Sequence, residues 1–538
     1  MSEQIRLAAN AVIAKVFTTN KDVKNIIAEA LSYVQDGVEF TRAFKSYGWN
    51  GRSSFFSHRT CTFPAGFVHM VHQILIQKGY EVQIIKHPFP APLGVENPIV
   101  DEFGNDDPRY DFQLKALRAV EKHGQGIIQV ATGGGKTKIA KLIMVRYRRM
   151  SLFLTTRGVL MHQMRKSLIE AGFNVGVIGD EMWSPIRGIN VGMVQTFVAN
   201  LEVPNLDAEI RQIVKSNAMA EERAIKKGLT SSSPLNRDQI VALAKDRFQK
   251  KERIRARTIK LLEMMEVVIG EEAHEAGGNS YYAITEHCNK AFIRVALTAT
   301  PFMRESAEDN MRLMAAFGPK LIQISEDTLI KRGILATPYF LFTNYKPHPK
   351  LRKTSPWQRA YQLGIVECED RNEKILHFAK KASSYGLPVM ILIQRKDHGI
   401  RLKKLLREHD LKTEFIYGDN NNDERAETLS RLGTGDIQVL IGTTILDVGV
   451  DVPAVGMVIN AGGGKAEIGL RQRIGRGLRA KKTQPNACIV VEFNDDINTY
   501  LRDHARQRRA IIEATECFKE RIIEDSDSFD WSIFSKYN

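Results

Sequence analysis

A glycine-dense turn after the apolar run 127–130 carries the residues best placed for chemistry, and a helical pattern follows it. The residues concerned are Gly133, Gly134, Gly135, Lys136 and Thr137. The glycines let backbone N–H groups turn inward around phosphate oxygens, and the helix start adds a partial positive charge. The lysine can reach the β and γ phosphates of a nucleotide, and the threonine hydroxyl can ligate Mg²⁺. The spacing predicts a nucleotide-phosphate site, although Val130 stands where the complete pattern has a glycine; the alternative is a glycine-rich connector.

Two adjacent carboxylates and a histidine follow a second apolar run, residues 267–270. A buried strand there would deliver Glu271, Glu272 and His274 at its end. Beside a phosphate site, Glu271 can join the Mg²⁺ shell and Glu272 can polarise the attacking water. His274 can couple the site to neighbouring elements.

Two further groups can complete a nucleotide site. Gln113 opens a helical pattern shortly before the glycine turn, and its amide offers adenine one donor and one acceptor. Much later, Arg473, Arg476 and Arg479 follow each other at i, i+3 and i+6, roughly along one helical face. Such a face can neutralise the charge that builds on the γ phosphate. The second half of the chain has no glycine phosphate loop, so we expect one nucleotide between two lobes.

The elements that must position these groups are apolar runs that end in polar residues. They include residues 127–130, 152–154, 191–194 and 267–270, and later 389–393, 415–416 and 439–441. Helical patterns separate them, which predicts parallel sheets whose strand ends line a ligand crevice. The fold class is therefore α/β, with two parallel-sheet lobes in tandem. We place lobe 1 at residues 101–318, lobe 2 at 319–510 and a C-terminal tail at 511–538.

Residues 1–100 predict a small N-terminal α/β module and a linker. The module has interleaved aromatic and basic residues, namely Tyr47, Trp49, Arg52, Phe55, Phe56 and Arg59. Such a set suits nucleic-acid contact by stacking and phosphate pairing, and it equally suits a core of the module's own. The prolines between residues 88 and 98 predict a stiff linker.

Residues 200–262 predict a helical hairpin inserted in lobe 1. They are charged and helical in character, with a break at 231–234, and Ser233-Pro234 is typical of a helix start. The second arm is strongly basic, with Lys245, Arg247, Lys250, Lys251, Arg253, Arg255, Arg257 and Lys260 against two acidic residues. This run is either a solvated face or a phosphate-contacting surface.

The bulk composition limits the class of protein and its partners. The 538 residues are too many for one core, and 43% hydrophobic and 26% charged content is that of an ordinary globular protein. A formal charge of +15 and a pI near 9.4 indicate a polyanionic partner. No apolar run is long enough for a membrane span, and the N-terminus lacks a signal-peptide core, so we expect no membrane partner. Five scattered cysteines fit a reducing compartment and no zinc site.

Taken in order, these blocks resemble the motor of superfamily 2 helicases and translocases, over roughly residues 106–510. The matching positions are Gln113 (Q motif), Gly133 to Thr137 (motif I), Glu271-Glu272-Ala273-His274 (the Asp-Glu-x-His box), Gly449 and Asp451 (motif V), and Gln472 to Arg479 (motif VI). Glu271 replaces the Asp of the box, which moves its carboxylate by one methylene. The resemblance implies two RecA-like lobes that use ATP and Mg²⁺. It also implies nucleotide contacts from Gly449 and Asp451, and catalytic roles for Gln472 and for Arg476 and Arg479 as arginine fingers.

Within this superfamily, residues 48–51 and 63–66 are similar to the module that precedes the motor in phage UvsW-type DNA helicases, which are related to RecG and XPB. The similarity implies a phage enzyme of replication, recombination or repair that acts on single-stranded, forked or four-way-junction DNA. It would work in the cytoplasm of a bacterial host, as a monomer, with phage recombination or single-strand-binding proteins as partners. The alternatives are an RNA helicase and the motor subunit of a nuclease or restriction complex. The box is not Asp-Glu-Ala-Asp and motif VI begins with Gln472 rather than His, and both features favour DNA.

Overall fold

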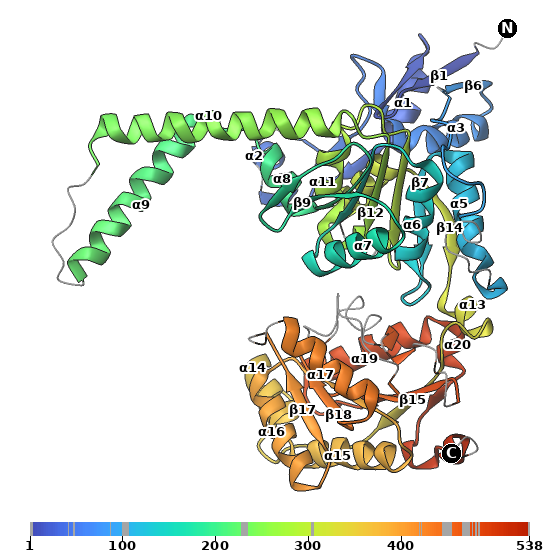
Figure 1. Cartoon of the computed structure of the whole chain (residues 1–538), viewed down its shortest axis with the longest axis vertical. Helices are drawn as coiled ribbons and strands as arrows, with labels where there is room; N and C mark the ends of the chain where they lie inside the picture. Colours follow the sequence, from blue (N-terminus) through green and yellow to red (C-terminus); the bar gives the residue numbers. More distant parts are fainter. Residues whose placement is uncertain are drawn as a thin grey trace. The chain divides into compact units, whose positions relative to one another are not determined.

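The structure, a computed structural model, describes most of the chain. The described residues are 4–40, 42–46, 49–86, 88–98, 107–226, 235–302, 306–418, 420, 422–443, 455–464, 474–475, 477–478, 481 and 485–535. The chain divides into two compact units. The first contains most of residues 1–322, and the second contains residues 323–538 with the segments 106–113 and 129–136. Figure 1 labels the elements of both.

The N-terminal module is a four-stranded sheet in the order β5-β2-β1-β6, packed against two helices. The strands are β1 (Ile5–Ala9), β2 (Ile13–Phe17), β5 (Thr62–Pro64) and β6 (Val82–Lys86), and the helices are α1 (Lys21–Ala30) and α3 (Val68–Gln77). A second, two-stranded sheet pairs β3 (Ser32–Val34) with β4 (Arg52–Ser54), and short helical turns lie at η1 (Val38–Phe40), α2 (Arg42–Ser46) and η2 (Ala65–Phe67). The predicted α/β character of this module is confirmed.

Lobe 1 is built on an eight-stranded sheet in the order β10-β9-β11-β8-β12-β13-β7-β14. The strands are β7 (Gln125–Val130), β8 (Ser151–Thr155), β9 (Val175–Gly179), β10 (Met182–Ser184), β11 (Ile189–Met193), β12 (Val267–Glu271), β13 (Ile293–Thr298) and β14 (Lys320–Ile324). The inner strands β8, β11, β12 and β13 pair in parallel and are almost wholly buried, which explains their unbroken apolar runs. Because β14 is an edge strand of this sheet, lobe 1 continues beyond the expected boundary at residue 318.

Helices surround the lobe 1 sheet. They are α5 (Asp111–His123), α6 (Lys136–Tyr147), α7 (Gly158–Glu170), α8 (Val194–Leu201), α11 (Ala273–Thr285) and α12 (Ala307–Phe317). The short elements η3 (Pro108–Tyr110) and α13 (Glu326–Lys331) fall in the second unit. Phe197, Tyr281 and Phe317 bring three of them, α8, α11 and α12, into one buried core with residues of the sheet. The predicted α/β fold class is confirmed for this lobe.

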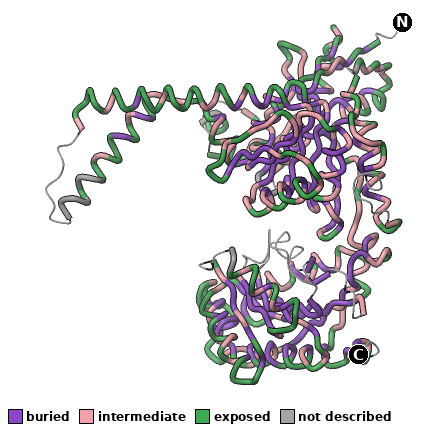
Figure 2. The backbone as a smooth tube through the Cα atoms, viewed as in Figure 1, coloured by how far each residue is buried: buried purple, intermediate pink, exposed green. Residues whose placement is uncertain are grey.

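The predicted hairpin is present as α9 (Leu206–Lys226) and α10 (Arg237–Leu262), which run out from lobe 1 (Figure 1). Much of their described surface is exposed (Figure 2). Helix α10 begins at Arg237, and Ser233-Pro234 lies outside the described residues. Asn236 caps the helix: its side chain accepts from the backbone N–H of Gln239 at 2.9 Å, and the Gln239 side chain accepts from the backbone N–H of Asn236 at 3.0 Å. This reciprocal cap satisfies the N–H groups of the first turn.

Lobe 2 is built on a seven-stranded sheet in the order β17-β18-β16-β19-β20-β15-β21, in which every pair is parallel. The strands are β15 (Thr337–Thr343), β16 (Val389–Leu392), β17 (Thr413–Ile416), β18 (Val439–Gly442), β19 (Met457–Asn460), β20 (Ala487–Phe493) and β21 (Ile522–Ile523). The helical elements are α14 (Trp357–Tyr361), the π-helical turn η4 (Gln362–Val366), α15 (Glu369–Ser384), α16 (Lys396–Glu408), α17 (Asn422–Thr434), α19 (Thr499–Glu513), α20 (Glu516–Lys519), η6 (Ser526–Ser528) and α21 (Ser532–Ser535).

The C-terminal segment expected as a tail belongs to lobe 2. Strand β21 pairs with β15 at the edge of the sheet, and Phe529 and Phe534 are buried in the lobe 2 core, with Trp531 packed against them. Phe529, Trp531 and Ile533 alternate with polar residues, which is a strand pattern, but the described residues there form no strand and lead into the short helix α21, so the sequence did not reveal the packing.

Candidate nucleotide site

Strand β7 ends in the predicted glycine turn, and helix α6 begins at Lys136. Gly133 and Gly135 have φ values of +87° and +83°, which side chains rarely adopt, so glycine is required at both positions. A Cβ on Gly134 would lie 2.5 Å from Cγ1 of Val130, and the Gly134 N–H donates to the Ala131 carbonyl at 3.0 Å. The valine at the first position of the pattern therefore packs under the turn.

Gln113 lies near the start of α5 and is 4% exposed. Its Nε2 donates to the carbonyl oxygen of Gly134 at 3.4 Å. The structure thus joins the glutamine to the glycine turn, and its contact with adenine stays a prediction.

Glu271, the last residue of β12, is brought to the start of α6. The Thr137 hydroxyl donates to Oε1 of Glu271 at 2.9 Å, and Glu271 is 4% exposed. The Tyr281 hydroxyl of α11 donates to the Glu271 backbone carbonyl at 3.0 Å and fixes the end of the strand. The methylene that distinguishes this residue from aspartate does not keep its carboxylate from the threonine.

This pair has the chemistry of a magnesium site. A hydroxyl and a carboxylate are hard oxygen ligands, and Mg²⁺ usually takes one or two protein ligands with phosphate oxygens and waters. Among the described residues, no group of three His, Cys, Asp or Glu side chains is arranged to hold a metal. Thr137 and Glu271 would therefore hold Mg²⁺ together with a nucleotide, where the ion neutralises phosphate charge.

Glu272 has a left-handed backbone, with φ 46° and ψ 49°, and it precedes the first turn of α11. A residue with a side chain adopts this conformation at a cost, and such strain concentrates at functional sites. Sequence reasoning placed the carboxylate at the strand end, but a positive φ at a glutamate has no sequence signature.

Several predicted site residues lie outside the described part of the chain. These are Gly449, Asp451, Gln472, Arg476 and Arg479. His274 lies in the first turn of α11, and its side chain is likewise outside the description. Their roles stay predictions.

Lobe 2 contains a buried charge network that the sequence did not reveal. Arg508 of α19 donates to Glu492 at 2.9 Å and to Asp495 at 3.0 Å, and its Nη1 donates to the carbonyl of Gly464. Arg371 of α15 donates to the Ala461 carbonyl at 2.7 Å. The two arginines fix the loop 461–464 that leads toward the predicted motif VI. The partners are far apart in sequence, so no local pattern could show them.

The aromatic residues of the N-terminal module are mostly part of its core. Phe56 is 5% exposed, and Phe55 is half-buried against Phe67 and against Tyr282 of lobe 1. The Trp49 indole donates to the carbonyl of Arg52 at 3.0 Å, and Tyr47 lies outside the described residues. Of the two alternatives, core packing holds for Phe55 and Phe56, and among the described members of the set only Arg52 and Arg59 are exposed.

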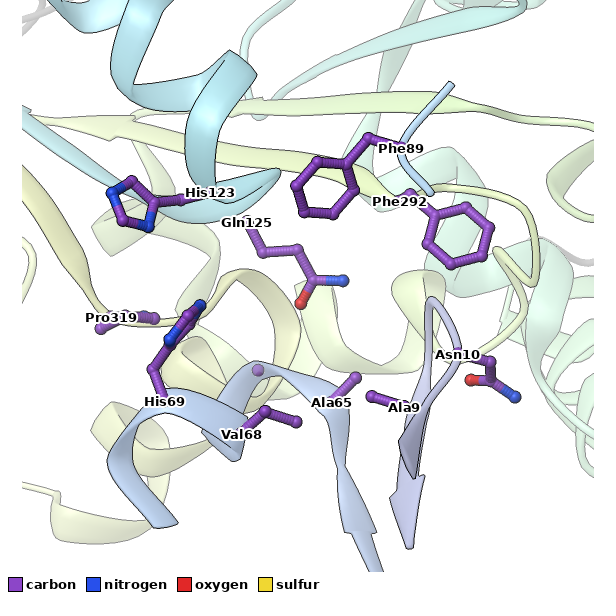
Figure 3. Close-up of a pocket in the computed structure, with 11 residues that line it drawn as sticks. Ala9, Asn10, Ala65, Val68, His69, Phe89, His123, Gln125, Phe292 and Pro319 are labelled. Carbon is purple, nitrogen blue, oxygen red and sulfur yellow. The ribbon is translucent and has the colours of Figure 1, made fainter. Parts of the chain in front are cut away.

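The module and its linker lie directly on lobe 1. Figure 3 shows the seam, where His69 of α3 faces His123 of α5 with ring centroids 5.8 Å apart. The Gln125 side chain donates to the Ala11 carbonyl at 3.1 Å, and Phe89 and Phe292 line the same small cavity of about 50 Å³. That volume holds a few waters at most, so the seam is a packing interface rather than a ligand pocket.

Two family models match the chain. The model described as "Helicase conserved C-terminal domain" matches residues 369–481, and the model described as "Type III restriction enzyme, res subunit" matches residues 108–303. The first falls within lobe 2 and the second within lobe 1, and together they span more than half of the chain.

Known proteins resemble the chain at low identity. A protein named "Putative helicase 22", from Sulfolobus islandicus filamentous virus (isolate Iceland/Hveragerdi), is 24% identical over 267 residues, which is 46% of this chain and 46% of the relative. The structure of UvsW from bacteriophage T4 is 16% identical and covers 97% of this chain and 99% of that one, with a TM-score of 0.44. The DUF1998 helicase MrfA, bound to DNA, is 13% identical and covers 81% of this chain and 52% of that one, with a TM-score of 0.50. The chain spans less than two-thirds of the length of the curated relatives it matches.

Proposed function

We propose that the chain is a superfamily 2 helicase that hydrolyses ATP, and that it unwinds or branch-migrates forked and four-way-junction DNA. The observation that carries the nucleotide site is the 2.9 Å hydrogen bond from Thr137 to Glu271. It joins the first turn of the phosphate-loop helix to the carboxylate at the end of β12, and the two motifs are 134 residues apart.

The proposed site assigns one task to each residue. Backbone N–H groups of Gly133, Gly134 and Gly135 and the Lys136 ammonium hold the phosphates, and Gln113 reads adenine. Glu272 orients and deprotonates the attacking water. Arg476 and Arg479 stabilise the charge of the transition state as arginine fingers, and Gln472 assists the same step. Gly449 and Asp451 are further nucleotide contacts.

DNA is the proposed substrate for three reasons. The chain carries a formal charge of +15, which suits a phosphate backbone. Its acidic box is not Asp-Glu-Ala-Asp, and its motif VI begins with Gln472 rather than His. The exposed basic residues of α10 supply a surface for duplex phosphates.

Forks and four-way junctions are proposed because the motor by itself grips one strand. The N-terminal module resembles that of UvsW-type helicases and lies against lobe 1, where it can meet a duplex arm through Arg52 and Arg59. A phage origin, a role in replication, recombination or repair, a bacterial cytoplasmic location and monomeric action follow from the same resemblance. In the part of the chain that the structure describes, no helix has the length and apolar character needed to cross a bilayer.

A restriction or nuclease motor is the second candidate, because the model that matches lobe 1 carries the name of a restriction-enzyme subunit. That function needs a nuclease partner. The two candidates differ in whether the purified chain alone remodels DNA.

ATPase rate and strand separation, measured with single-stranded DNA, forked DNA, four-way junctions and duplex RNA, test the proposal. We expect the junction substrates to be remodelled and the RNA to stimulate little ATPase.

Lys136→Ala should lower ATP turnover by about 10²-fold or more, since it removes the positive charge that contacts the transferred phosphate, while DNA binding persists. Lys122→Ala, which removes an exposed lysine from α5, is the matched control. Equal stimulation by duplex RNA would replace DNA with RNA as substrate, and near-normal turnover in Lys136→Ala would overturn the site.

A further inference from the structure

Lobe 2 has a cationic loop that none of the nucleotide-site residues uses. The loop joins β15 to α14, and the segment 344–366 contains no aspartate or glutamate. Three of its side chains, Lys350, Arg352 and Arg359, line an open pocket of about 380 Å³ together with Thr354 and Ser355. The pocket lining is therefore cations, hydroxyls and two prolines, without a carboxylate.

The three cations are available for a ligand. All three are exposed, and within the described ranges none of them forms an ion pair with an acidic side chain. Other basic residues of this lobe are paired: Lys403 bonds to Glu414, and Arg508 is buried between two carboxylates. Three unpaired cations around one hollow leave a concentrated positive potential.

A buried amide holds the loop that presents these cations. Asn498 is fully buried, and its Nδ2 donates to the carbonyls of Arg352, Lys353 and Ser355 at 3.0, 3.2 and 3.1 Å. The backbone N–H of Thr499 donates to the Lys353 carbonyl at 3.1 Å. These contacts turn three carbonyl oxygens into the protein, where they do not repel an anion, and they fix the loop before any ligand arrives.

Aromatic rings lie beside the pocket. Trp357 follows the pocket residue Pro356 and lies 4.7 Å from the ring of His504 and 6.4 Å from that of Tyr500, which is 50% exposed. Cations that track a backbone, next to rings on which bases can stack, form the surface that binds single strands without sequence preference.

We propose that this pocket binds the phosphodiester backbone of a single nucleic-acid strand. Arg352 and Arg359 hold phosphate oxygens with their planar guanidinium groups, Lys350 adds charge, and a neighbouring base lies on the exposed ring of Tyr500. The inference rests on the proposed function and adds to it a strand contact on lobe 2 outside the helicase motifs.

The test compares two double variants that each remove two positive charges from lobe 2. Arg352→Gln with Arg359→Gln removes the pocket's guanidinium groups. Lys380→Gln with Lys412→Gln removes two exposed lysines elsewhere on the lobe. Binding of fluorescein-labelled oligothymidylate is followed by anisotropy from about 50 to about 200 mM salt, a range over which phosphate contacts lose affinity steeply. Each contact to a single strand contributes about 0.7 to the slope of log affinity against log salt.

We expect the slope of the pocket variant to be about 1.4 smaller than that of the wild type, because two phosphate contacts are removed. Its affinity near 0.1 M salt should be roughly tenfold lower or more, while the lysine control matches the wild type. The altered side chains are exposed, so both variants should melt at the wild-type temperature. An unchanged slope in the pocket variant, with normal wild-type binding, would overturn this inference and leave the proposed function intact. If the wild type fails to bind oligothymidylate, the proposed function itself fails. Inorganic phosphate is also added to the labelled oligothymidylate complex, with chloride at the same ionic strength as the comparison. If phosphate displaces the oligonucleotide and chloride does not, the pocket is a small-anion site and strand binding is overturned.

Discussion

His398 is a fully buried histidine in lobe 2 whose neutral form the fold requires. Its Nε2 lies 3.0 Å from Oδ1 of Asn372, whose Nδ2 donates to the Val366 carbonyl, so the imidazole donates to the amide oxygen. Burial, and then the nearby charges of Arg371 and Arg401, lower the pKa of His398 from 6.5 to about 3. A proton is therefore bound far more readily in the unfolded chain than in the folded lobe.

Because of His398, the free energy of unfolding should decrease as the pH is lowered. Above the unfolded pKa of 6.5 neither state is protonated at His398, and no stability is lost there. As pH falls from 6.5 toward 3, the unfolded state gains the proton first, and the free energy of unfolding drops by about 1.4 kcal/mol per pH unit, or about 2 kcal/mol at pH 5. Urea unfolding of lobe 2 at both ends of that range measures the loss. His398→Gln, which keeps a donor but does not titrate, should remove most of it, and exposed His409→Gln should not. A slope unchanged in His398→Gln would assign the acid sensitivity to other groups.

Residue types and spacing predicted the candidate groups, and the structure shows two contacts among them, Thr137 with Glu271 and Gln113 with Gly134. Their roles in nucleotide chemistry stay predictions. What the sequence did not give is how the groups are held. The hydroxyl of Tyr281 on the Glu271 carbonyl and the left-handed turn at Glu272 depend on where α11 packs, which is a tertiary property.

Among the elements, helix α10 uses part of its basic run for structural contacts. Nε of Arg255 donates to the Leu201 carbonyl at 3.1 Å, and the guanidinium of Arg257 stacks on Trp183 at 4.1 Å from the ring centroid. Lys251 pairs with the buried carboxylate of Glu209 on α9. These three hold the hairpin to itself and to lobe 1, so the one-signed run is partly structural.

The remaining exposed cations of α10 are the ones to test for DNA contact. We expect Arg247, Lys250 and Arg253, changed together to Glu, to weaken binding of duplex DNA. Each lost contact should lower the salt slope by about 0.9, because that fraction of a counterion is no longer released. Lys380, Lys412 and Lys519, changed together to Glu on lobe 2, give the same change in net charge away from the hairpin. Equal slopes in the two variants would make this part of α10 a solvated face.

At the scale of the whole molecule, the N-terminal module and lobe 1 share one hydrophobic core. Ala315 of α12 is buried among Phe67, Val71 and other module residues, and Met314 packs against them. The linker runs along the end of α6. The Gly94 N–H donates to the Arg146 carbonyl at 2.9 Å, and the Arg146 side chain donates to the Gly94 carbonyl at 2.7 Å. Arg149 donates to the Ala91 carbonyl. The prolines do not make a free spacer, so removing residues 1–98 would expose an apolar face of lobe 1.

A single substitution at the seam tests the docking without a truncation. A Cβ on Gly66 would lie 2.2 Å from the backbone oxygen of Met314, so Gly66→Ala forces the module away from α12. We expect a loss of about 1–3 kcal/mol, seen as a lower melting temperature and faster proteolysis of the linker. Gly418→Ala on lobe 2, where nothing lies within 4 Å, should melt like the wild type. Wild-type melting of Gly66→Ala would mean that the module is not held by this contact.

The two parallel sheets and the hairpin followed from apolar runs and helical periods, because buried parallel strands and long polar helices leave clear patterns. The boundaries of the two lobes did not follow from these patterns. Strand β14 and the segment 522–534 join their sheets and cores through short groups of apolar residues that do not show where they pack. The module's aromatics pack against α12, some 250 residues later in the chain.

That separation has a consequence for synthesis on the ribosome. The module's strands and helices emerge first, but the face that includes Phe67 and Val71 is completed only when Ala315 has left the exit tunnel. At about 5–20 residues per second, the wait is roughly 12–50 s. During that interval the nascent chain carries an apolar surface that only later translation can cover, so pausing between the module and α12 should lengthen its dependence on chaperones.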